Sequence, residues 1–182
     1  LIMHEITVAV VQMFPHLGQI EDNLIAMGKF VDSICTEQKV DLIVFPELIT
    51  TGNECGVSFT DFAQRIPGPT INLVGQRASE YGVHIAFGLV TKEKVESILH
   101  NTLMLMGPDG DIIGQYHKVH LRGEERMTFR PGFRYVVLET EFGVVGLMLG
   151  WDLAFPEVAR SLALEGAELL VVSANWETPH SD

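Results

Sequence analysis

Three short segments carry residues of types that serve acid–base or nucleophilic chemistry, and the first is Phe45-Pro46-Glu47. It places a carboxylate directly after an apolar run, at the expected end of a buried strand, and α/β sheets bind ligands at the carboxyl ends of their strands. Because partial burial raises the pKa of a glutamate, Glu47 is a candidate general base. The alternative is a strand-end glutamate that faces solvent, the usual environment of this residue type.

The second segment, residues 116–121, ends another predicted strand and contains Lys118. A fixed ammonium group at this place could stabilise an oxyanion, whereas the alternative is an ordinary surface lysine. His117 and His120 are three residues apart, so on a strand they face opposite sides, and no further cluster of metal ligands follows. We therefore expect no metal site here.

The third segment, residues 143–157, combines an apolar strand, a tight turn at Gly150 and the start of a helix. Many hydrolases carry their nucleophile on such a strand-to-helix turn. Glycine, however, has no side chain and cannot attack a carbonyl or nitrile carbon. The alternative interpretation is a glycine that permits a strained turn and close packing of the following helix.

The hydrophobic pattern predicts the elements that must position these segments. Apolar residues recur at helical spacing from Leu24 to Ile34, which predicts a helix over residues 21–38. Two more helices are predicted over 69–81 and 156–165, and strands over 6–11, 40–45, 83–90, 102–106, 112–116, 134–138, 144–149 and 167–173. Strands that alternate with helices indicate an α/β fold. A Gly-Pro-Asp-Gly turn at 107–110 joins two strands as a hairpin, so the sheets are expected to be mixed.

Composition limits the classes of protein to which the chain can belong. Its 182 residues, 47% hydrophobic and 20% charged, indicate one folded domain rather than a disordered chain. The net charge of −12 argues against a nucleic acid or an anionic membrane as a partner. No apolar run is long enough to cross a bilayer, and the first residues lack the basic region of a secretory signal. Cys35 and Cys55 form no metal or redox spacing, so a reducing, cytoplasmic setting is expected.

Taken together and in order, the three segments resemble the three signature blocks of the nitrilase (carbon–nitrogen hydrolase) superfamily. In that family a cysteine stands directly before the aromatic–acid pair found here as Trp151-Asp152. The resemblance covers essentially the whole chain. Further segments that resemble the family are Val10–Met13 with Gly18 and Asn23-Leu24, Asn101-Thr102, Pro108–Gly110, Phe129–Gly132, Leu162–Ala167 and Ala174–Trp176.

The resemblance implies an αββα sandwich of two mixed β-sheets flanked by helices. It also implies a single carbon–nitrogen hydrolase domain over residues 1–182 that lacks its C-terminal portion, because family members continue beyond Asn175-Trp176. If the chain ended at Asp182, sheet edges and apolar faces would be left uncovered.

The resemblance further implies a Glu–Lys–Cys triad. By position, Glu47 is the general base, Lys118 the oxyanion stabiliser and Glu125 a second glutamate, for which neighbouring Glu124 fits less well. Gly150 takes the place of the nucleophile. Substrate contacts are expected from Trp151, whose backbone N–H would help to form the oxyanion hole, and from Asn175 and Trp176.

The reaction that the resemblance implies is cleavage of a small amide through an acyl-enzyme on the cysteine, without cofactor or metal. Assembly into a homo-oligomer is expected on the same ground. With Gly150, the chain as written is predicted to be inactive. Cys55, in the loop that follows Glu47, is the one conceivable substitute thiol, and we do not expect it to act, because attack requires near-contact geometry.

Three interpretations of the glycine stay open. The chain is a mutated or partial copy of an active hydrolase, a pseudoenzyme that still binds a small amide, or a shortened module that interacts with another subunit. We favour the first, because Glu47, Lys118 and Glu125 are all present. Burying three ionisable groups costs stability unless they are paired, so a protein without function has little reason to keep them.

Overall fold

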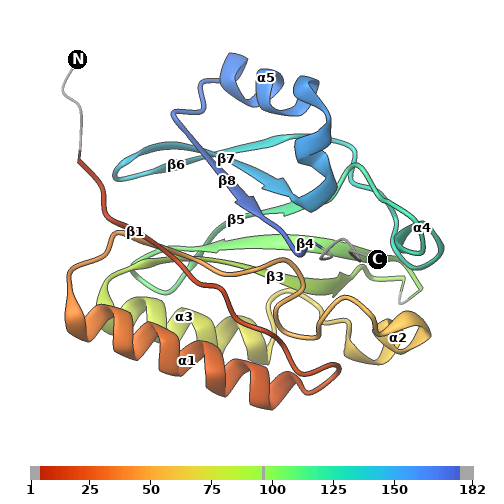
Figure 1. Cartoon of the computed structure of the whole chain (residues 1–182), viewed down its shortest axis with the longest axis horizontal. Coiled ribbons are helices and arrows are strands. Elements are labelled where there is room, and N and C mark those ends of the chain that lie inside the picture. Colours follow the sequence, from red (N-terminus) through yellow and green to blue (C-terminus); the bar gives the residue numbers. More distant parts are fainter. Residues whose placement is uncertain (1–4, 96, 177–182) are drawn as a thin grey trace, which may run out of the picture.

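The chain folds in layers, with two β-sheets stacked face to face and helices on their outer sides (Figure 1). The structure is a computed structural model that describes residues 5–95 and 97–176. The first sheet contains, in spatial order, β1 (Val8–Val10), β2 (Leu42–Val44), β3 (His84–Lys92), β4 (Leu99–Met106) and β5 (Ile112–His117). The second contains β6 (Val136–Thr140), β7 (Gly143–Leu149) and β8 (Leu169–Ser173). The longer helices are α1 (Ile20–Glu37), α3 (Pro69–Tyr81) and α5 (Pro156–Leu164), and the short helical turns are η1 (Gly56–Ser58), α2 (Phe59–Phe62), α4 (Glu125–Thr128) and η2 (Gly150–Ala154).

Both sheets are mixed, as the sequence predicts. β1, β2 and β3 run parallel, whereas β3, β4 and β5 pair antiparallel. In the second sheet β7 is antiparallel to β6 and parallel to β8. Helices α1 and α3 cover the outer face of the first sheet and α5 that of the second (Figure 1). The αββα arrangement expected from the sequence is therefore confirmed.

The predicted elements lie close to the observed ones. α3 begins at Pro69 and ends before Gly82, whose φ of 61° is left-handed and stops the helix. The strand predicted over 134–138 is displaced by two residues, to Val136–Thr140. The short helical turns were not predicted, because three to five residues are too few for a periodic hydrophobic pattern. Within the described ranges, no helix combines the length and apolar character needed to span a bilayer.

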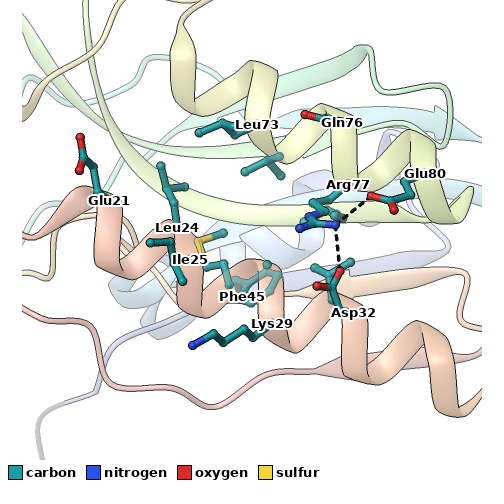
Figure 2. A pocket seen from close by; sticks show the side chains of 15 residues that line it. Glu21, Leu24, Ile25, Lys29, Asp32, Phe45, Leu73, Gln76, Arg77 and Glu80 are labelled. Atoms are coloured by element: carbon teal, nitrogen blue, oxygen red, sulfur yellow. Dashed lines mark hydrogen bonds and ion pairs between the residues drawn. The ribbon is translucent and has the colours of Figure 1, made fainter.

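A groove of about 850 Å³ opens between α1 and α3 on the outer side of the first sheet (Figure 2). Its floor includes Phe45 and its rim carries Arg77. The guanidinium of Arg77 lies 3.2 Å from a carboxylate oxygen of Asp32 and 2.9 Å from one of Glu80. The first of these exposed ion pairs links α1 to α3 and the second lies within α3, and exposed pairs of this kind contribute little to stability. None of the predicted catalytic residues lines the groove.

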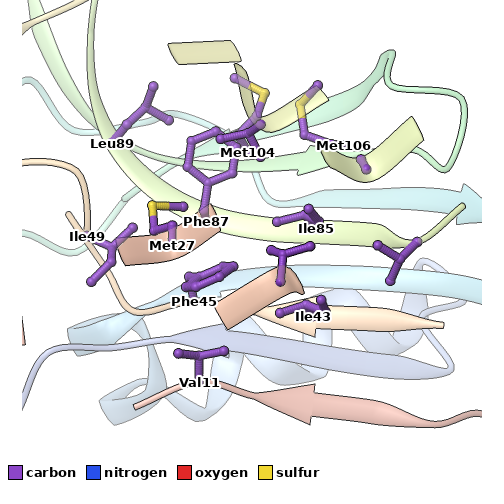
Figure 3. Close-up of a cluster of buried hydrophobic side chains, with 14 of the residues drawn as sticks. Val11, Met27, Ile43, Phe45, Ile49, Ile85, Phe87, Leu89, Met104 and Met106 are labelled. Carbon is purple, nitrogen blue, oxygen red and sulfur yellow. The ribbon is translucent and has the colours of Figure 1, made fainter. Parts of the chain in front are cut away.

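Alternation along the strands divides the core into two layers. On β4, Met104 and Met106 face the helices and join the outer cluster drawn in Figure 3, with Phe45 and Phe87. Leu103 and Leu105 face the second sheet and join the cluster between the sheets. Because side chains alternate with a period of two, every odd-numbered residue of β4 points to the space between the sheets.

The first sheet has more strands than the second, and the consequence is seen at its edge strand β1. β5 packs against β6, β4 against β7 and β3 against β8. On β1, Ala9 packs on the outer cluster, so Val8 and Val10 point to the opposite, inner side. They are 38% and 78% exposed. The inner face of β1 is thus an exposed apolar strip.

Candidate active site

Glu47 lies just beyond the end of β2 and is almost fully buried, at 4% exposure. The next residue, Leu48, has a φ of 49°, a strained value for a side chain other than glycine. Gly88 on β3 lets this turn approach the sheet, since a Cβ there would lie 2.8 Å from the Glu47 Cα and overlap the Leu48 nitrogen. The backbone around Glu47 is therefore fixed by close contact with β3.

Lys118 follows β5 directly and is also buried. Its side chain projects to the same inner side as that of Tyr116, two residues earlier. The ammonium Nζ donates to Glu47 Oε1 at 2.7 Å and to Glu125 Oε1 and Oε2 at 2.7 and 3.0 Å. Three carboxylate oxygens thus lie within hydrogen-bond distance of one ammonium group.

Glu125 begins the short helix α4 and completes the cluster. Its Oε2 also accepts the backbone N–H of Arg122 at 2.9 Å, which fixes the carboxylate relative to its own loop. The neighbouring Glu124 is exposed and makes no side-chain hydrogen bond within the described residues. The structure therefore brings together Glu47, Lys118 and Glu125, and it favours Glu125 over Glu124 as the second glutamate.

The electrostatics of the cluster follow from burial and pairing. Burial raises the pKa of Glu47, and the nearby Lys118 ammonium offsets this only in part. For Lys118, burial alone would lower the pKa, but the Glu47 and Glu125 carboxylates outweigh it and the net pKa is raised. The cluster thus combines a carboxyl group whose charged form is disfavoured by burial with an ammonium group whose charged form is stabilised by its partners.

Gly150 lies at the centre of this cluster, where β7 ends and η2 begins. Its φ of 39° is the strained, left-handed value of a sharp turn. A Cβ placed there would lie 3.3 Å from Lys118 Nζ and would overlap Glu47 Oε2. Within the described residues Oε2 receives no hydrogen bond, in contrast to Oε1. A side chain at position 150 would thus begin in contact with both Glu47 and Lys118.

Asp152, two residues further on, is fully buried and fully hydrogen bonded. Its carboxylate accepts from the Tyr116 hydroxyl at 2.7 Å, from the Leu149 N–H at 3.2 Å, and from both the backbone N–H and Nδ1 of His120 at 2.9 Å. The sequence did not predict this role. An acid directly after a buried strand and turn was the available signal.

Aromatic rings border the turn. Trp151 contacts Trp176, with ring centroids 6.5 Å apart, and the guanidinium of Arg122 lies 4.6 Å over its ring. Trp176 is 54% exposed. Asn175 is half-buried, and its side chain makes no hydrogen bond with the described residues. Two of the three residues expected to contact substrate, Trp151 and Trp176, thus lie against each other, and Trp151 directly follows Gly150.

The remaining candidates lie in other surroundings. The ring of His117 stacks on His100 with centroids 4.2 Å apart, and burial lowers the pKa of His117 to about 4. His120 instead stacks on Phe155. Cys55 donates to the Thr51 carbonyl at 3.2 Å, and burial raises the pKa of its thiol. No group of three metal-ligating side chains is present in residues 5–95 and 97–176.

Known proteins resemble the chain along nearly its whole length. Residues 7–181 match the family model for carbon-nitrogen hydrolases. A probable nitrilase of Schizosaccharomyces pombe is 43% identical over 178 residues, which are 96% of this chain and 65% of that protein. A nitrilase of Pyrococcus abyssi is 36% identical over 180 residues, 97% of this chain and 67% of that protein.

Solved structures share the fold. Nit3 of Saccharomyces cerevisiae, a member of branch 10 of the nitrilase superfamily, superposes with a TM-score of 0.88 at 23% identity, over 95% of this chain and 65% of that one. A mutant of an amidase from Nesterenkonia AN1 does so with a TM-score of 0.86 at 23% identity, over 96% of this chain and 66% of that one. The chain thus spans about two thirds of the length of these proteins.

Proposed function

Because this chain belongs to the carbon-nitrogen hydrolase family, we propose that the cluster around position 150 is the site of a hydrolase for small, non-peptide amides. The observation that carries the proposal is the position of the Cβ that any residue other than glycine would have at 150. It lies 3.3 Å from Lys118 Nζ and so close to Glu47 Oε2 that this carboxylate oxygen must shift slightly to make room. A nucleophile mounted there would have a base and a cation within contact distance, as covalent catalysis requires.

The chemistry that this geometry supports begins with a thiol at position 150. Glu47 takes the thiol proton through Oε2, the oxygen that no described residue engages. The thiolate attacks the amide carbon, and the Lys118 ammonium and the Trp151 N–H stabilise the negative oxygen that forms. Glu47 returns its proton to the amide nitrogen, the carbon–nitrogen bond breaks and ammonia leaves. A water activated by Glu47 then hydrolyses the thioester and releases the carboxylic acid.

Glycine at position 150 removes the first step of this sequence. We therefore propose that the chain as written does not hydrolyse amides through a covalent intermediate. Cys55 does not replace the missing thiol, because its S–H group donates a hydrogen bond to the Thr51 carbonyl and burial raises the pKa of the thiol.

The second candidate is a protein of the same fold that binds a small amide, or another subunit, without hydrolysis. The intact Glu47–Lys118–Glu125 cluster beside the exposed Trp176 favours it. Calorimetry of the chain with short-chain amides and carboxylic acids tests binding. Heat that disappears in a Lys118→Met variant would support it, and the absence of heat with every compound would count against it.

The experiment for the hydrolase is the Gly150→Cys substitution, with Gly150→Ser and Gly150→Cys/Glu47→Gln as matched variants. Ammonia release from a panel of short aliphatic amides is followed together with the mass of the protein. We expect ammonia release from Gly150→Cys alone, either with turnover or once per protein with a stable acyl adduct on the new thiol.

Alkylation by acrylamide gives a readout that does not require turnover. The new thiol should react faster than Cys35 and Cys55, whose pKa values are raised by burial. A folded Gly150→Cys protein whose new thiol reacts no faster than these two internal controls would overturn the proposal.

A further inference from the structure

Asn101 is a polar residue in a row of leucines. It lies on β4, where the inward-facing positions are Leu99, Asn101, Leu103 and Leu105. Its side chain is buried at 1% exposure in the same space between the sheets. The strand pattern predicts an apolar residue at this position, so packing of the core does not explain the amide group.

The amide of Asn101 bridges the two carboxylates of the candidate site. Its Nδ2 donates to Glu47 Oε1 at 2.7 Å and to Glu125 Oε1 at 3.3 Å. Its backbone carbonyl accepts the N–H of Lys118 at 2.9 Å. The two carboxylates can only accept hydrogen bonds when ionised, so the amide nitrogen must be the atom that faces them. One residue therefore contacts all three ionisable members of the cluster.

These contacts settle how the Glu47 carboxylate is turned. Lys118 and Asn101 both bond to Oε1 of Glu47, and they approach from two different strands. Two donors on one oxygen fix the carboxylate plane, which leaves Oε2 directed to position 150. With Lys118 alone, the terminal torsion of the glutamate, which is broad and weakly restricted, would be free to rotate about a single bond.

We propose that Asn101 is a positioning residue of the candidate site, which holds Glu47 and Glu125 so that the free oxygen of Glu47 faces the nucleophile position. This rests on the proposed function for its catalytic meaning, whereas the orientation of the two carboxylates does not depend on it. The fold gains little from the amide. The Oδ1 atom is buried without a partner, and an unsatisfied buried polar atom destabilises a fold.

That imbalance supplies a test, because replacing Asn101 by leucine removes an unsatisfied oxygen and continues the leucine row. We expect Asn101→Leu to remain folded, because the loss of a donor to Glu47 is offset in part by the loss of the unsatisfied Oδ1 atom. The substitution should destabilise the ionised form of Glu47, because its carboxylate loses one of its two hydrogen-bond donors.

The experiment is a pH titration of the chain labelled with ¹³C at the glutamate carboxyl carbons, followed by NMR. A Glu47→Gln spectrum assigns the Glu47 signal. Glu47 faces Lys118, Glu125 and Asn101, and the hydrogen bond from Asn101 lowers its pKa. In Asn101→Leu the pKa of Glu47 should rise by about one unit, the shift expected when one hydrogen bond to a carboxylate is lost.

The matched control is Thr102→Val, on the same strand but on its opposite face. Thr102 is equally buried and bonds to Thr91 and His117 at 2.7 and 2.9 Å. Its loss should leave the glutamate titration unchanged. An unchanged titration in a folded Asn101→Leu protein would overturn the inference. If the leucine variant does not fold, Asn101→Ala is titrated in its place, with the same two outcomes.

In the Gly150→Cys background, Asn101→Leu should also slow acrylamide alkylation about tenfold at pH 7 and move the acidic limb of its pH profile upward. A residue that only supported the fold would leave that limb in place. A Gly150→Cys protein with an unreactive thiol would refute the proposed function, while the NMR titration of the unmodified chain would still decide the role of Asn101.

Discussion

The carboxylates of Asp152 and Glu47 are both buried beside the Gly150 turn, but they have different partners. Asp152 accepts four hydrogen bonds, from Tyr116, Leu149 and both nitrogens of His120 that face it. Glu47 receives two, both on Oε1. Both oxygens of the Asp152 carboxylate are hydrogen bonded, whereas Glu47 keeps Oε2 without a hydrogen bond from the described residues, close to position 150.

The two networks also differ in which group has its pKa raised. Burial and the Asp152 carboxylate raise the pKa of the Tyr116 hydroxyl, so this proton stays in place. In the cluster, burial raises the pKa of Glu47 itself, which favours the protonated form of this carboxyl group. The difference is the one expected if the Asp152 network holds the turn and the Glu47–Lys118–Glu125 cluster serves the proposed proton transfer.

Among the substitutions that test this comparison, Asp152→Ala should cause the largest loss of stability. Asp152→Ala leaves the Tyr116 hydroxyl and the Leu149 N–H buried without an acceptor. We expect a loss of about 4 kcal/mol in the free energy of unfolding, from two or more unsatisfied donors. Urea denaturation at pH 7 measures it. A loss below about 1 kcal/mol would show that Asp152 is not the clamp of the turn.

A smaller and pH-dependent effect is expected from Lys118→Met. Without the ammonium group, Glu47 and Glu125 face one another as buried carboxylates, and we expect a loss of about 3 kcal/mol at pH 7. The pKa of Glu47 is already raised by burial, and removal of the cation raises it further. The loss should therefore shrink as the pH falls towards 4, because the carboxyl becomes neutral in the folded state.

The Asp152→Ala loss should not shrink over the same range, which makes the two variants matched controls for each other. Parallel losses at all pH values would remove the distinction drawn between the two networks. Urea denaturation at pH 7, 6, 5 and 4 compares them directly.

The smallest expected effect lies outside both networks, at His117 on the opposite face of the first sheet. Burial and the stacked His100 lower its pKa to about 4 from about 6.5, while Glu93 raises it and Arg134 lowers it. A lowered histidine pKa means that stability is fully present above pH 6.5 and is lost as the pH falls towards 4. His117→Gln should remove about 2 kcal/mol of this acid sensitivity.

Thermal unfolding of both proteins at pH 7 and pH 4.5 checks the prediction for His117. Equal acid sensitivity in the two proteins would mean that the ring is protonated in the fold without cost. In that case burial of His117 beside His100 would not lower its pKa in the folded protein.

The elements and much of the site could be predicted from local pattern, for identifiable reasons. The helix over 69–81 has a proline at its start and a glycine after its end, and both signals are local. Glu47 lies shortly after β2 and Lys118 directly after β5, so their place at a sheet edge follows from the chain order. The position of Gly150 follows in the same way from the apolar strand that precedes it.

Other parts of the site depend on contacts between residues far apart in sequence. Asn101 bonds to Glu47 across 54 positions and Tyr116 to Asp152 across 36. No local pattern fixes such pairs. Weak signals existed even so, namely a polar residue in a row of leucines at Asn101 and an isolated glycine inside a strand at Gly88. Glu125 was assigned only through the family resemblance, because a four-residue helix gives no periodicity.

The exposed inner face of β1 has a practical consequence for how the protein behaves in concentrated solution. Val8 and Val10 lie on a short edge strand, and edge strands with apolar side chains invite contact between copies. At neutral pH the net charge of −12 opposes such contact through mutual repulsion. The repulsion vanishes near the isoelectric point of about 4.9. Colloidal stability should therefore be lowest between pH 4.5 and 5.5, roughly where charge cancels, and acid titrations are best made on dilute samples.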